Sequence, residues 1–516
     1  MFLQTLRLRN LRCLSDTGSI PIKPLTVLVG RNSAGKSTFL RAFPLLRQSV
    51  ETARSSPILW YRPQYIDFGS FHDAVNDRAS ERDITFEFQL TLPQDAKIAI
   101  GDPSFRVAMT LSNGGTQRGV HVSVYEIHAE GHEIRLDFDP SARAKRFVVN
   151  GRDMLTPGGF WLGGKTHLLP PLQTLPNPSV AYQPVTQPLA KIRYQNGADG
   201  VLLAKLVEAT SGLFRKNTGE ESRINVADAM LFGLRSQMHE QLKSLSTHGT
   251  FRERVDSLEL GDEHSEYIID HAVARLIPYI IEASDQVLAD LMSRVAYVAP
   301  KRAAAERAYR LQDLAVTDVD PSGDNLAMFL HSLSPDESES LADFTRSWLD
   351  FSPKMHVEGM HAGILVTEAG ATSPRNIVDI GFGYAEVLPV AAAVWSACVR
   401  SPKPGARPNS LIAIEQPELH LHPAFQAKLA AMFTGALQAS RKRGNETNII
   451  IETHSEALIS KLGQLVHEGK IDENDVQLVV FDRDPETLGT QVTLAKYDEE
   501  GALRNWPYGF FLYDND

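Results

Sequence analysis

The chain has 516 residues, of which 43% are hydrophobic and 22% charged, so its composition excludes a disordered or fibrous protein. At about 150 residues per domain, this length predicts one to three domains and a large buried core. The net charge of −11 excludes an overall basic field that would draw the whole chain onto nucleic acid or an anionic membrane. Any such contact must be a local patch.

Two cysteines, Cys13 and Cys398, are too few for a disulfide framework or a cysteine-rich zinc site, and they fit a reducing compartment. Arginines at positions 7, 9 and 12 interrupt the N-terminus before the apolar region of a signal peptide can form. The longest apolar stretch, 387–399, is shorter than the ~20 residues of a membrane helix. We therefore expect a cytoplasmic protein with no membrane partner.

The first 155 residues predict a strand–loop–helix unit followed by a sheet. Alternating apolar residues over 2–11 and an apolar run over 25–29 predict strands, and a helix is expected over 36–48. Five further runs with period two predict an antiparallel sheet: 84–92, 106–111, 120–127, 133–138 and 146–149. The segment 1–155 is thus the predicted N-terminal half of an α/β domain.

The middle of the chain differs in composition. Residues 156–198 are rich in Gly and Pro, which predicts a linker, and apolar residues at helical spacing over 199–298 predict a mainly helical insertion that extends to 353. The α/β pattern returns over 354–516, with a hairpin-like stretch, helices near 384–400, 423–442 and 455–468, and strands near 410–414, 448–451 and 476–481. Alternating strands and helices imply a parallel sheet. Its other half lies near residue 30, so we predict one α/β sheet split by the insertion.

The sequence Gly30-Arg31-Asn32-Ser33-Ala34-Gly35-Lys36-Ser37 fits the phosphate-loop pattern and lies between a predicted strand and a predicted helix. Backbone N–H groups of such a loop point at phosphate oxygens, helped by the positive end of the helix dipole. Lys36 is expected to reach the β- and γ-phosphates of ATP, Ser37 to bind Mg²⁺, and Thr38 to lie close to the α-phosphate.

A second predicted strand ends in a carboxylate at Glu415, where an acid is needed to hold Mg²⁺ opposite Ser37. Gln416 and Glu418 follow directly, and the next strand leads to His454 at the edge where ligands collect in such sheets. His420 and His422 have weak spacing for zinc, so Mg²⁺ is the only metal we predict. Gly381 and Gly383 precede a predicted helix, which makes a second candidate anion site at its N-terminus.

These motifs resemble, in their order, the ABC-type ATPases of the overcoming-lysogenization-defect (OLD) and RecF-like group. The resemblance rests on Gly30–Thr38, Asp379–Gly383, Ile414–Pro423 and Glu452–Ser455, and more narrowly it is to the defence-associated ATPase subunits of Septu, retron-linked Septu-like and PARIS systems. The closing segment 505–511 is similar to the C-terminal signature of many of these proteins. The implied fold is an ABC-type ATPase head with a mixed central sheet and an antiparallel β subdomain.

The resemblance also implies a head-to-tail dimer, with ATP held between one subunit's phosphate loop and the other's turn at Gly381–Tyr384. His454 would then be the switch histidine at the γ-phosphate. Two departures are visible: Ala385-Glu386 stands where the group often has Ser-Gln, and Gln416 stands where many members carry the catalytic glutamate. The general base is therefore Glu418 or absent, so slow turnover is expected. Gln48 and Gln64 are the candidates for a glutamine switch.

Four functions are compatible with this pattern. The favoured one is a nucleotide-gated sensor in antiphage defence that controls a separate effector, a nuclease or toxin, because nothing after Asp482 leaves room for a nuclease domain. DNA or a phage protein could be its trigger. The others are a RecF-like DNA repair ATPase, a non-hydrolysing ATP-bound scaffold and, least favoured, a transporter cassette. Local basic clusters, such as Lys301-Arg302, are mostly expected to be solvated, although Arg302 could lie near phosphate or at a subunit contact.

Overall fold

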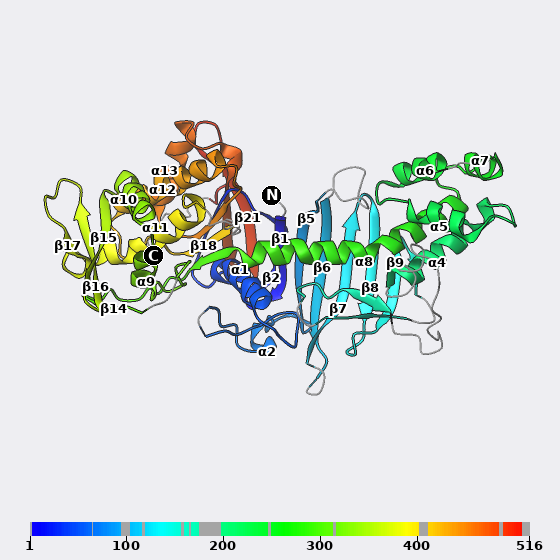
Figure 1. Ribbon diagram of the computed structural model, residues 1–516, viewed down its shortest axis with the longest axis horizontal. Coiled ribbons are helices and arrows are strands. Elements are labelled where there is room, and N and C mark those ends of the chain that lie inside the picture. The colour runs from blue at the N-terminus through cyan, green and yellow to red at the C-terminus, as the bar shows by residue number, and fades with distance from the viewer. Residues whose placement is uncertain are drawn as a thin grey trace. The chain divides into compact units, whose positions relative to one another are not determined.

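The structure of the protein is a computed structural model (Figure 1). The residues that it describes are 3–63, 65–93, 104–115, 119–155, 159–164, 167–174, 198–245, 249–312, 316–401, 411–483 and 489–507. The chain forms two compact units. Unit 1 comprises Met1–Arg7, Thr52–Leu59 and Ser80–Asp290, and unit 2 comprises Leu8–Glu51, Trp60–Ala79 and Leu291–Asp516. Each unit contains segments that are distant in the sequence.

Unit 1 is built on the predicted antiparallel sheet. Its strands follow one another in the order of the chain: β5 (Asp83–Thr91), β6 (Ser104–Asn113), β7 (Val120–Ala129), β8 (His132–Phe138), β9 (Ala144–Val149) and β10 (Arg152–Asp153), with the start of β1 (Leu3–Leu11) beside β5. A separate pair is formed by β11 (Phe160–Leu162) and β12 (Leu172–Thr174). The alternating hydrophobic pattern is confirmed because neighbouring strands pair along nearly their full length.

The helices of unit 1 confirm the helical pattern after residue 198. They are α4 (Ala198–Thr210), η1 (Ser211–Leu213), α5 (Glu220–Asp228), α6 (Arg235–Ser244), α7 (Gly249–Asp256) and the long α8 (Glu263–Ser293), which continues into unit 2 after Asp290. Asp270 of α8 accepts hydrogen bonds from Asn150 and Arg152 at the β9–β10 turn, which fixes the helix to the end of the sheet. The prediction of helix up to residue 298 was wrong at its end, because Val295–Val298 form the strand β13.

Unit 2 contains the remaining elements. They are β2 (Leu14–Asp16), β3 (Ile20–Pro21), β4 (Leu25–Gly30), α1 (Lys36–Glu51), α2 (Phe71–Ala74), β13, β14 (Tyr309–Arg310), α9 (Leu326–His331), α10 (Pro335–Leu349), β15 (Phe351–Glu358), β16 (His361–Glu368), β17 (Arg375–Asn376), η2 (Ile377–Asp379), α11 (Phe382–Cys398), β18 (Leu411–Glu415), α12 (Pro423–Lys442), β19 (Asn448–Glu452), α13 (Glu456–His467), η3 (Glu473–Asp475), β20 (Val476–Arg483), β21 (Thr490–Tyr497) and β22 (Leu503–Arg504).

The main sheet of unit 2 has the strand order β13-β18-β19-β4-β20-β21-β22, in which the first five strands are parallel. β4 comes from the N-terminal part of the chain and its neighbours from the C-terminal part, so the predicted split sheet is confirmed. Strands β4, β18 and β19 are buried along their whole length, as expected of a parallel sheet covered on both faces. The carboxyl ends of these parallel strands therefore meet at one edge.

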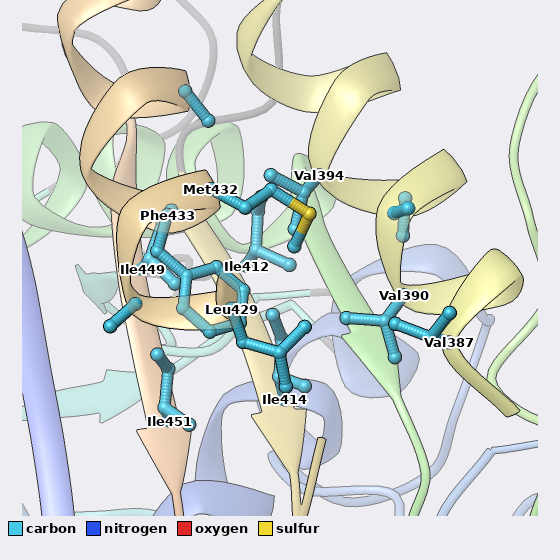
Figure 2. Close-up of a cluster of buried hydrophobic side chains, with 14 of the residues drawn as sticks. Val387, Val390, Val394, Ile412, Ile414, Leu429, Met432, Phe433, Ile449 and Ile451 are labelled. Atoms are coloured by element: carbon cyan, nitrogen blue, oxygen red, sulfur yellow. The ribbon is translucent and has the colours of Figure 1, made fainter. Parts of the chain in front are cut away.

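Helices α11 and α12 cover one face of this sheet. Figure 2 shows Val387, Val390 and Val394 of α11 and Leu429, Met432 and Phe433 of α12 packed against Ile412, Ile414, Ile449 and Ile451. The sheet residues in this cluster alternate along β18 and β19, because successive side chains of a strand point to opposite faces. This packing holds the strand ends, and the polar residues after them, in fixed positions.

The predicted fold class is confirmed: a mixed α/β structure with a phosphate loop between β4 and α1, a large antiparallel sheet and a helical region. The domain bounds 1–155, 156–198, 199–353 and 354–516 stay predictions. Most of the expected linker, Gln64 and the closing residues 508–511 lie outside the described residues. Within the described part, no helix is both long and apolar enough to cross a membrane.

Candidate functional site

The phosphate loop begins at Gly30, where β4 ends beside Phe481 of β20. Gly30 has φ of 143°, and a Cβ atom there would lie 1.9 Å from the carbonyl oxygen of Phe481. No other residue fits without moving the strand, because both the backbone conformation and the space exclude a side chain. The sequence pattern that demands glycine here thus has a steric cause.

Lys36, the first residue of α1, lies inside the loop. Its side chain is buried, and Nζ donates hydrogen bonds to the carbonyl oxygens of Gly30 at 3.0 Å and Arg31 at 2.8 Å. Burial lowers the pKa of Lys36, while the nearby Glu452 and Glu418 carboxylates act in the opposite direction. The ammonium group is therefore already positioned in the loop, at the N-terminus of a helix.

The rest of the loop is held by its neighbours. The carbonyl oxygen of Ser33 accepts from Arg483 at 3.0 Å and that of Ala34 accepts from Thr490 Oγ1 at 3.0 Å. The loop residues differ in exposure: Arg31, Asn32 and Ser33 are exposed, whereas Ala34, Gly35 and Thr38 are buried. Side chains from β20 and β21 thus hold the loop backbone, while the exposed residues of the loop face solvent.

Two glutamates end the neighbouring strands β18 and β19 in the same register, Glu415 opposite Glu452. Ser37 Oγ donates a hydrogen bond to Glu452 Oε1 at 2.8 Å. Both oxygens of Glu415 are engaged elsewhere: Arg41 donates from Nε to Oε1 at 2.8 Å and from Nη2 to Oε2 at 2.7 Å, and Tyr297 Oη donates to Oε1 at 2.6 Å. The acid that faces Ser37 is therefore Glu452.

The electrostatics of these groups follow from their burial. Glu452 is 3% exposed, and burial raises its pKa to about 7, with Glu415 acting in the same direction and Ser37 and Lys36 in the opposite one. The hydrogen bonds to Glu415 raise the pKa of Arg41 above its ordinary value, and burial raises that of Tyr297. Two carboxylates side by side in a buried site favour a cation between or beside them.

The residues after β18 and β19 meet as predicted. Glu418 Oε1 accepts the backbone N–H of His454 at 2.7 Å, and within the described residues Oε2 is buried without a hydrogen-bond partner. Burial raises the pKa of Glu418. Gln416 has a left-handed backbone, with φ of 43°, and its N–H donates to the carbonyl oxygen of Glu452 at 2.8 Å. His454 is exposed, and partial desolvation and Lys36 lower its pKa.

The turn before α11 is exposed. Gly381 has φ of 107° and open space around its Cβ position, Phe382 is 58% exposed, and Gly383 packs against Leu421. The Phe382 ring lies edge-on to the His420 ring, with centroids 5.3 Å apart. An aromatic side chain at this exposure, in the turn Gly381–Tyr384, makes a surface that packing within one chain does not cover.

Arg302 connects this turn to the end of β18. Its buried guanidinium donates to the carbonyl oxygens of Glu415 at 3.1 Å and Gln416 at 3.3 Å and to the Glu386 carboxylate at 3.3 Å. Burial lowers the pKa of Arg302. Within the described residues its side chain thus binds the carboxyl end of β18 and Glu386 of α11 rather than lying on an exposed basic patch.

The structure brings together most of the predicted site residues: Gly30 to Thr38, Glu415, Gln416, Glu418 and His454. The predicted anion turn at Gly381 and Gly383 lies on the first turn of α11. Gln48 is buried and bonded to the backbone of Ile66, and His422 caps α12 by accepting the N–H of Ala424. The roles of all these residues stay predictions.

Three residues that contact this site were not identified from the sequence: Glu452, Arg41 and Tyr297. Glu452 ends an apolar strand, which is the same signal that identified Glu415. Arg41 lies one helical turn after Ser37, so the two share a face of α1. Tyr297 belongs to the four-residue strand β13, which follows a long helix without a turn signal.

The site fits a nucleotide with Mg²⁺. The described residues contain no group of three or more His, Cys, Asp or Glu side chains that could hold a metal ion, so a protein-only metal cage is absent there. Mg²⁺ is commonly bound by one or two carboxylates together with phosphate oxygens and waters. Lys36 inside a loop closed by Gly30, with Ser37 and a buried carboxylate beside it, provides that donor set.

Comparison with known proteins agrees with this geometry. Residues 1–130 match a family described as "AAA ATPase domain", and residues 264–460 match one described as "AAA domain, putative AbiEii toxin, Type IV TA system". The first match contains the phosphate loop and the second contains Glu415, Glu418 and His454. The two matched segments are separate in the chain, and both contribute to the main sheet of unit 2: the first contains β4, and the second contains β13, β18 and β19.

Two kinds of relative are similar to parts or all of the chain. A protein from Thermus scotoductus named "OLD nuclease" is 50% identical over 48 residues, which span 9% of this chain and 9% of that protein. Solved structures of Smc head domains align along nearly the whole chain at low scores. One from Pyrococcus furiosus has 13% identity, 96% coverage of both chains and a TM-score of 0.34. One from Thermotoga maritima has 9% identity, covers 96% of this chain and 100% of its own, and has a TM-score of 0.34.

Proposed function

We propose that this chain is an ABC-type ATPase that binds ATP with Mg²⁺, hydrolyses it slowly and acts as a nucleotide-gated regulator in bacterial antiphage defence. The observation that carries the ATPase part is the buried Lys36 ammonium inside the Gly30 loop, beside carboxylates at the ends of two parallel strands. The AAA ATPase matches and the short similarity to an OLD nuclease support it. ATP when bound supplies the γ-phosphoryl group whose transfer to water is the proposed reaction.

Individual residues have separate roles in the proposed binding and hydrolysis of ATP. Lys36 binds the β- and γ-phosphates, and the backbone N–H groups of the loop orient them. Glu418, whose Oε2 is free of hydrogen bonds in the described structure, accepts a proton from the attacking water, and His454 lies at the γ-phosphate. Gln416 orients the water but accepts no proton at neutral pH, so turnover is slow.

The regulatory part of the proposal concerns partners. Two copies of the chain associate head to tail, with the exposed Gly381–Tyr384 turn of one copy completing the nucleotide site of the other. The ATP-bound dimer holds or releases a separate cytoplasmic effector, a nuclease or toxin. The words "toxin" and "nuclease" in the names of the matched family and the partial relative support this choice. DNA or a phage protein is the proposed trigger.

A binding experiment tests the ATPase proposal. Lys36→Ala should weaken ATP binding by at least about 100-fold, because the loop then loses the cation that pairs with the phosphates. Lys442→Ala, at an exposed lysine at the end of α12, is the control and should bind ATP like the wild type. Isothermal titration calorimetry with a slowly hydrolysed ATP analogue measures both. Equal affinity of Lys36→Ala and the wild type would overturn the proposal.

A further inference from the structure

The Mg²⁺ position beside the phosphate loop has two candidate acids. Glu415 and Glu452 end adjacent parallel strands at the same register, so both carboxylates reach the edge of the sheet where α1 begins. The sequence identifies Glu415 as the acid because of the motif around it. The contacts of the two side chains differ, and this difference decides between them.

Glu415 is already fully paired. Arg41 binds both its oxygens in a two-pronged contact, at 2.8 Å and 2.7 Å, and Tyr297 Oη donates to it at 2.6 Å. Its exposed fraction is only 2%, and a two-pronged contact between arginine and a carboxylate is among the stronger hydrogen-bonded pairs. A cation that bound Glu415 directly would have to displace or approach the half-buried guanidinium of Arg41, which has the same sign.

Arg41 and Ser37 lie on the same helix. It lies on α1 four residues after Ser37, so the helix that presents the Ser37 hydroxyl also presents the arginine that occupies Glu415. Any shift of α1 that brings Ser37 to a metal ion keeps Arg41 one turn away on the same face. The residue that pairs with Glu415 and the residue that faces Glu452 are thus presented by one helix.

Glu452, in contrast to Glu415, has one carboxylate oxygen without a partner among the described residues. Its Oε1 accepts from Ser37 Oγ at 2.8 Å, whereas its Oε2 is buried without a hydrogen-bond partner among the described residues. A buried carboxylate oxygen without a partner costs free energy unless a cation or donor reaches it. Ser37, the residue expected to bind Mg²⁺, is its direct neighbour, so the two oxygens lie where one ion can contact both.

We propose that Glu452, rather than Glu415, supplies the protein carboxylate that binds Mg²⁺ together with Ser37. The proposal rests on the proposed function, because the ion enters with the nucleotide phosphates. Glu415 keeps its contacts with Arg41 and Tyr297 when the ion is bound. Lys36, which donates to the loop carbonyl oxygens in this structure, would bind the phosphates that enter with the ion.

The test measures metal binding rather than turnover. Mn²⁺ is used in place of Mg²⁺ because its electron paramagnetic resonance signal reports the free ion, and it is titrated into the protein with a slowly hydrolysed ATP analogue. Glu452→Gln should weaken Mn²⁺ binding by about 10- to 100-fold, the loss typical of an essential group at a metal site. Glu415→Gln, which removes the same charge one strand away, should change Mn²⁺ affinity less than about threefold.

Further variants keep the test valid if a glutamine variant folds poorly. Glu452→Asp retains a carboxylate and should recover part of the Mn²⁺ affinity lost in Glu452→Gln. Circular dichroism checks that each variant is folded. A loss of Mn²⁺ affinity in Glu415→Gln equal to or greater than that in Glu452→Gln would overturn the assignment, and so would a folded Glu452→Gln with unchanged affinity.

The two proposals fail in different ways. If the wild type binds the ATP analogue and Mn²⁺ but the order of the two variants is reversed, only the assignment of Glu452 is wrong. If the wild type does not bind the ATP analogue, the proposed function is wrong, and the assignment that rests on it is wrong as well.

Discussion

The phosphate-loop edge and the Gly381–Tyr384 turn are both part of unit 2, yet they are built in opposite ways. At the loop, Lys36, Glu415 and Glu452 are at most 3% exposed and bonded to backbone or side chains. At the turn, Phe382 is 58% exposed and nothing lies near the Cβ position of Gly381. The charged groups of the first region are buried and hydrogen-bonded within one chain, whereas the second region is exposed to solvent. Binding and turnover should therefore respond to different variants.

The largest effect on activity is expected at the phosphate-loop edge. Glu418→Gln should lower steady-state phosphate release by about 10²- to 10⁴-fold, the range for loss of a positioned general base, because an amide accepts no proton at neutral pH. ATP binding should remain, so the variant is trapped in the ATP-bound state. Glu500→Gln, at an exposed position, is the matched control. If Glu418→Gln hydrolysed ATP at the wild-type rate, Glu418 would not be the general base.

The companion change tests why turnover is slow. Gln416→Glu places a carboxylate directly after Glu415 and should accelerate phosphate release above that of the wild type. The measurement is the same steady-state assay, at saturating ATP. An unchanged or lower rate would mean that the amide at position 416 is not what limits hydrolysis.

The next effect concerns the link between the two regions. Arg302→Met should destabilise the folded state by about 3–5 kcal/mol, because it leaves the buried Glu386 carboxylate and two carbonyl oxygens without their partner. Arg307→Met removes the exposed pair with Asp379 and should change stability little. Urea denaturation followed by tryptophan fluorescence compares the two. Equal urea midpoints of Arg302→Met and Arg307→Met would contradict a stabilising role of the buried Arg302 guanidinium.

A smaller effect, on dimerisation, is expected at the Gly381–Tyr384 turn. Phe382→Glu should weaken nucleotide-dependent dimerisation by about 10-fold or more, since exposed aromatic residues often contribute strongly to interfaces. The ATP affinity of the single chain should stay unchanged. Sedimentation velocity with an ATP analogue measures the dimer, and Met360→Glu, at a position 60% exposed in the β15–β16 turn, is the control. Wild-type dimerisation in Phe382→Glu would place the interface elsewhere.

The smallest effect is a pH dependence without nucleotide or metal. Since the pKa of Glu452 is raised to about 7 in the folded protein, the folded state retains a proton that the unfolded chain loses above about pH 4.5. The contribution of Glu452 to the free energy of unfolding is therefore present at low pH and is lost as the pH rises through 7. Glu452→Gln should therefore gain stability relative to the wild type between pH 5 and pH 8, by on the order of 1–3 kcal/mol.

Thermal melts of both proteins in EDTA across this pH range measure the difference. Glu499→Gln, at an exposed glutamate, should show no such trend. A constant difference between Glu452→Gln and the wild type from pH 5 to pH 8 would contradict a raised pKa at position 452.

Much of unit 2 could be predicted because its signals are local. The loop pattern, the apolar strand before it and the helix after it lie within a few residues, and hydrophobic periodicity located β18, α12, β19 and α13. Strands and helices in alternation also implied that β4 joins the C-terminal strands. The phosphate loop could thus be assigned before any contact was known.

The partners of the acids could not be predicted in the same way. Whether Ser37 faces Glu415 or Glu452 depends on which strand lies beside β4, and strand order is set by packing over the whole sheet. The contact of Tyr297 with Glu415 requires β13 to pair with β18, although these strands are more than 100 residues apart in the chain. Sequence pattern finds the residue types, whereas the fold decides which of them meet.

Arg302 is a hydrogen-bonding partner shared by the end of β18 and by α11. One guanidinium binds the backbone of Glu415 and Gln416 and the carboxylate of Glu386, two residues after the Gly381–Tyr384 turn. Coupling between two binding sites is reciprocal: if nucleotide at the strand edge favours docking at Phe382, then docking raises nucleotide affinity by the same factor. A partner bound at the Gly381–Tyr384 turn would then lower the nucleotide concentration needed to fill the phosphate loop.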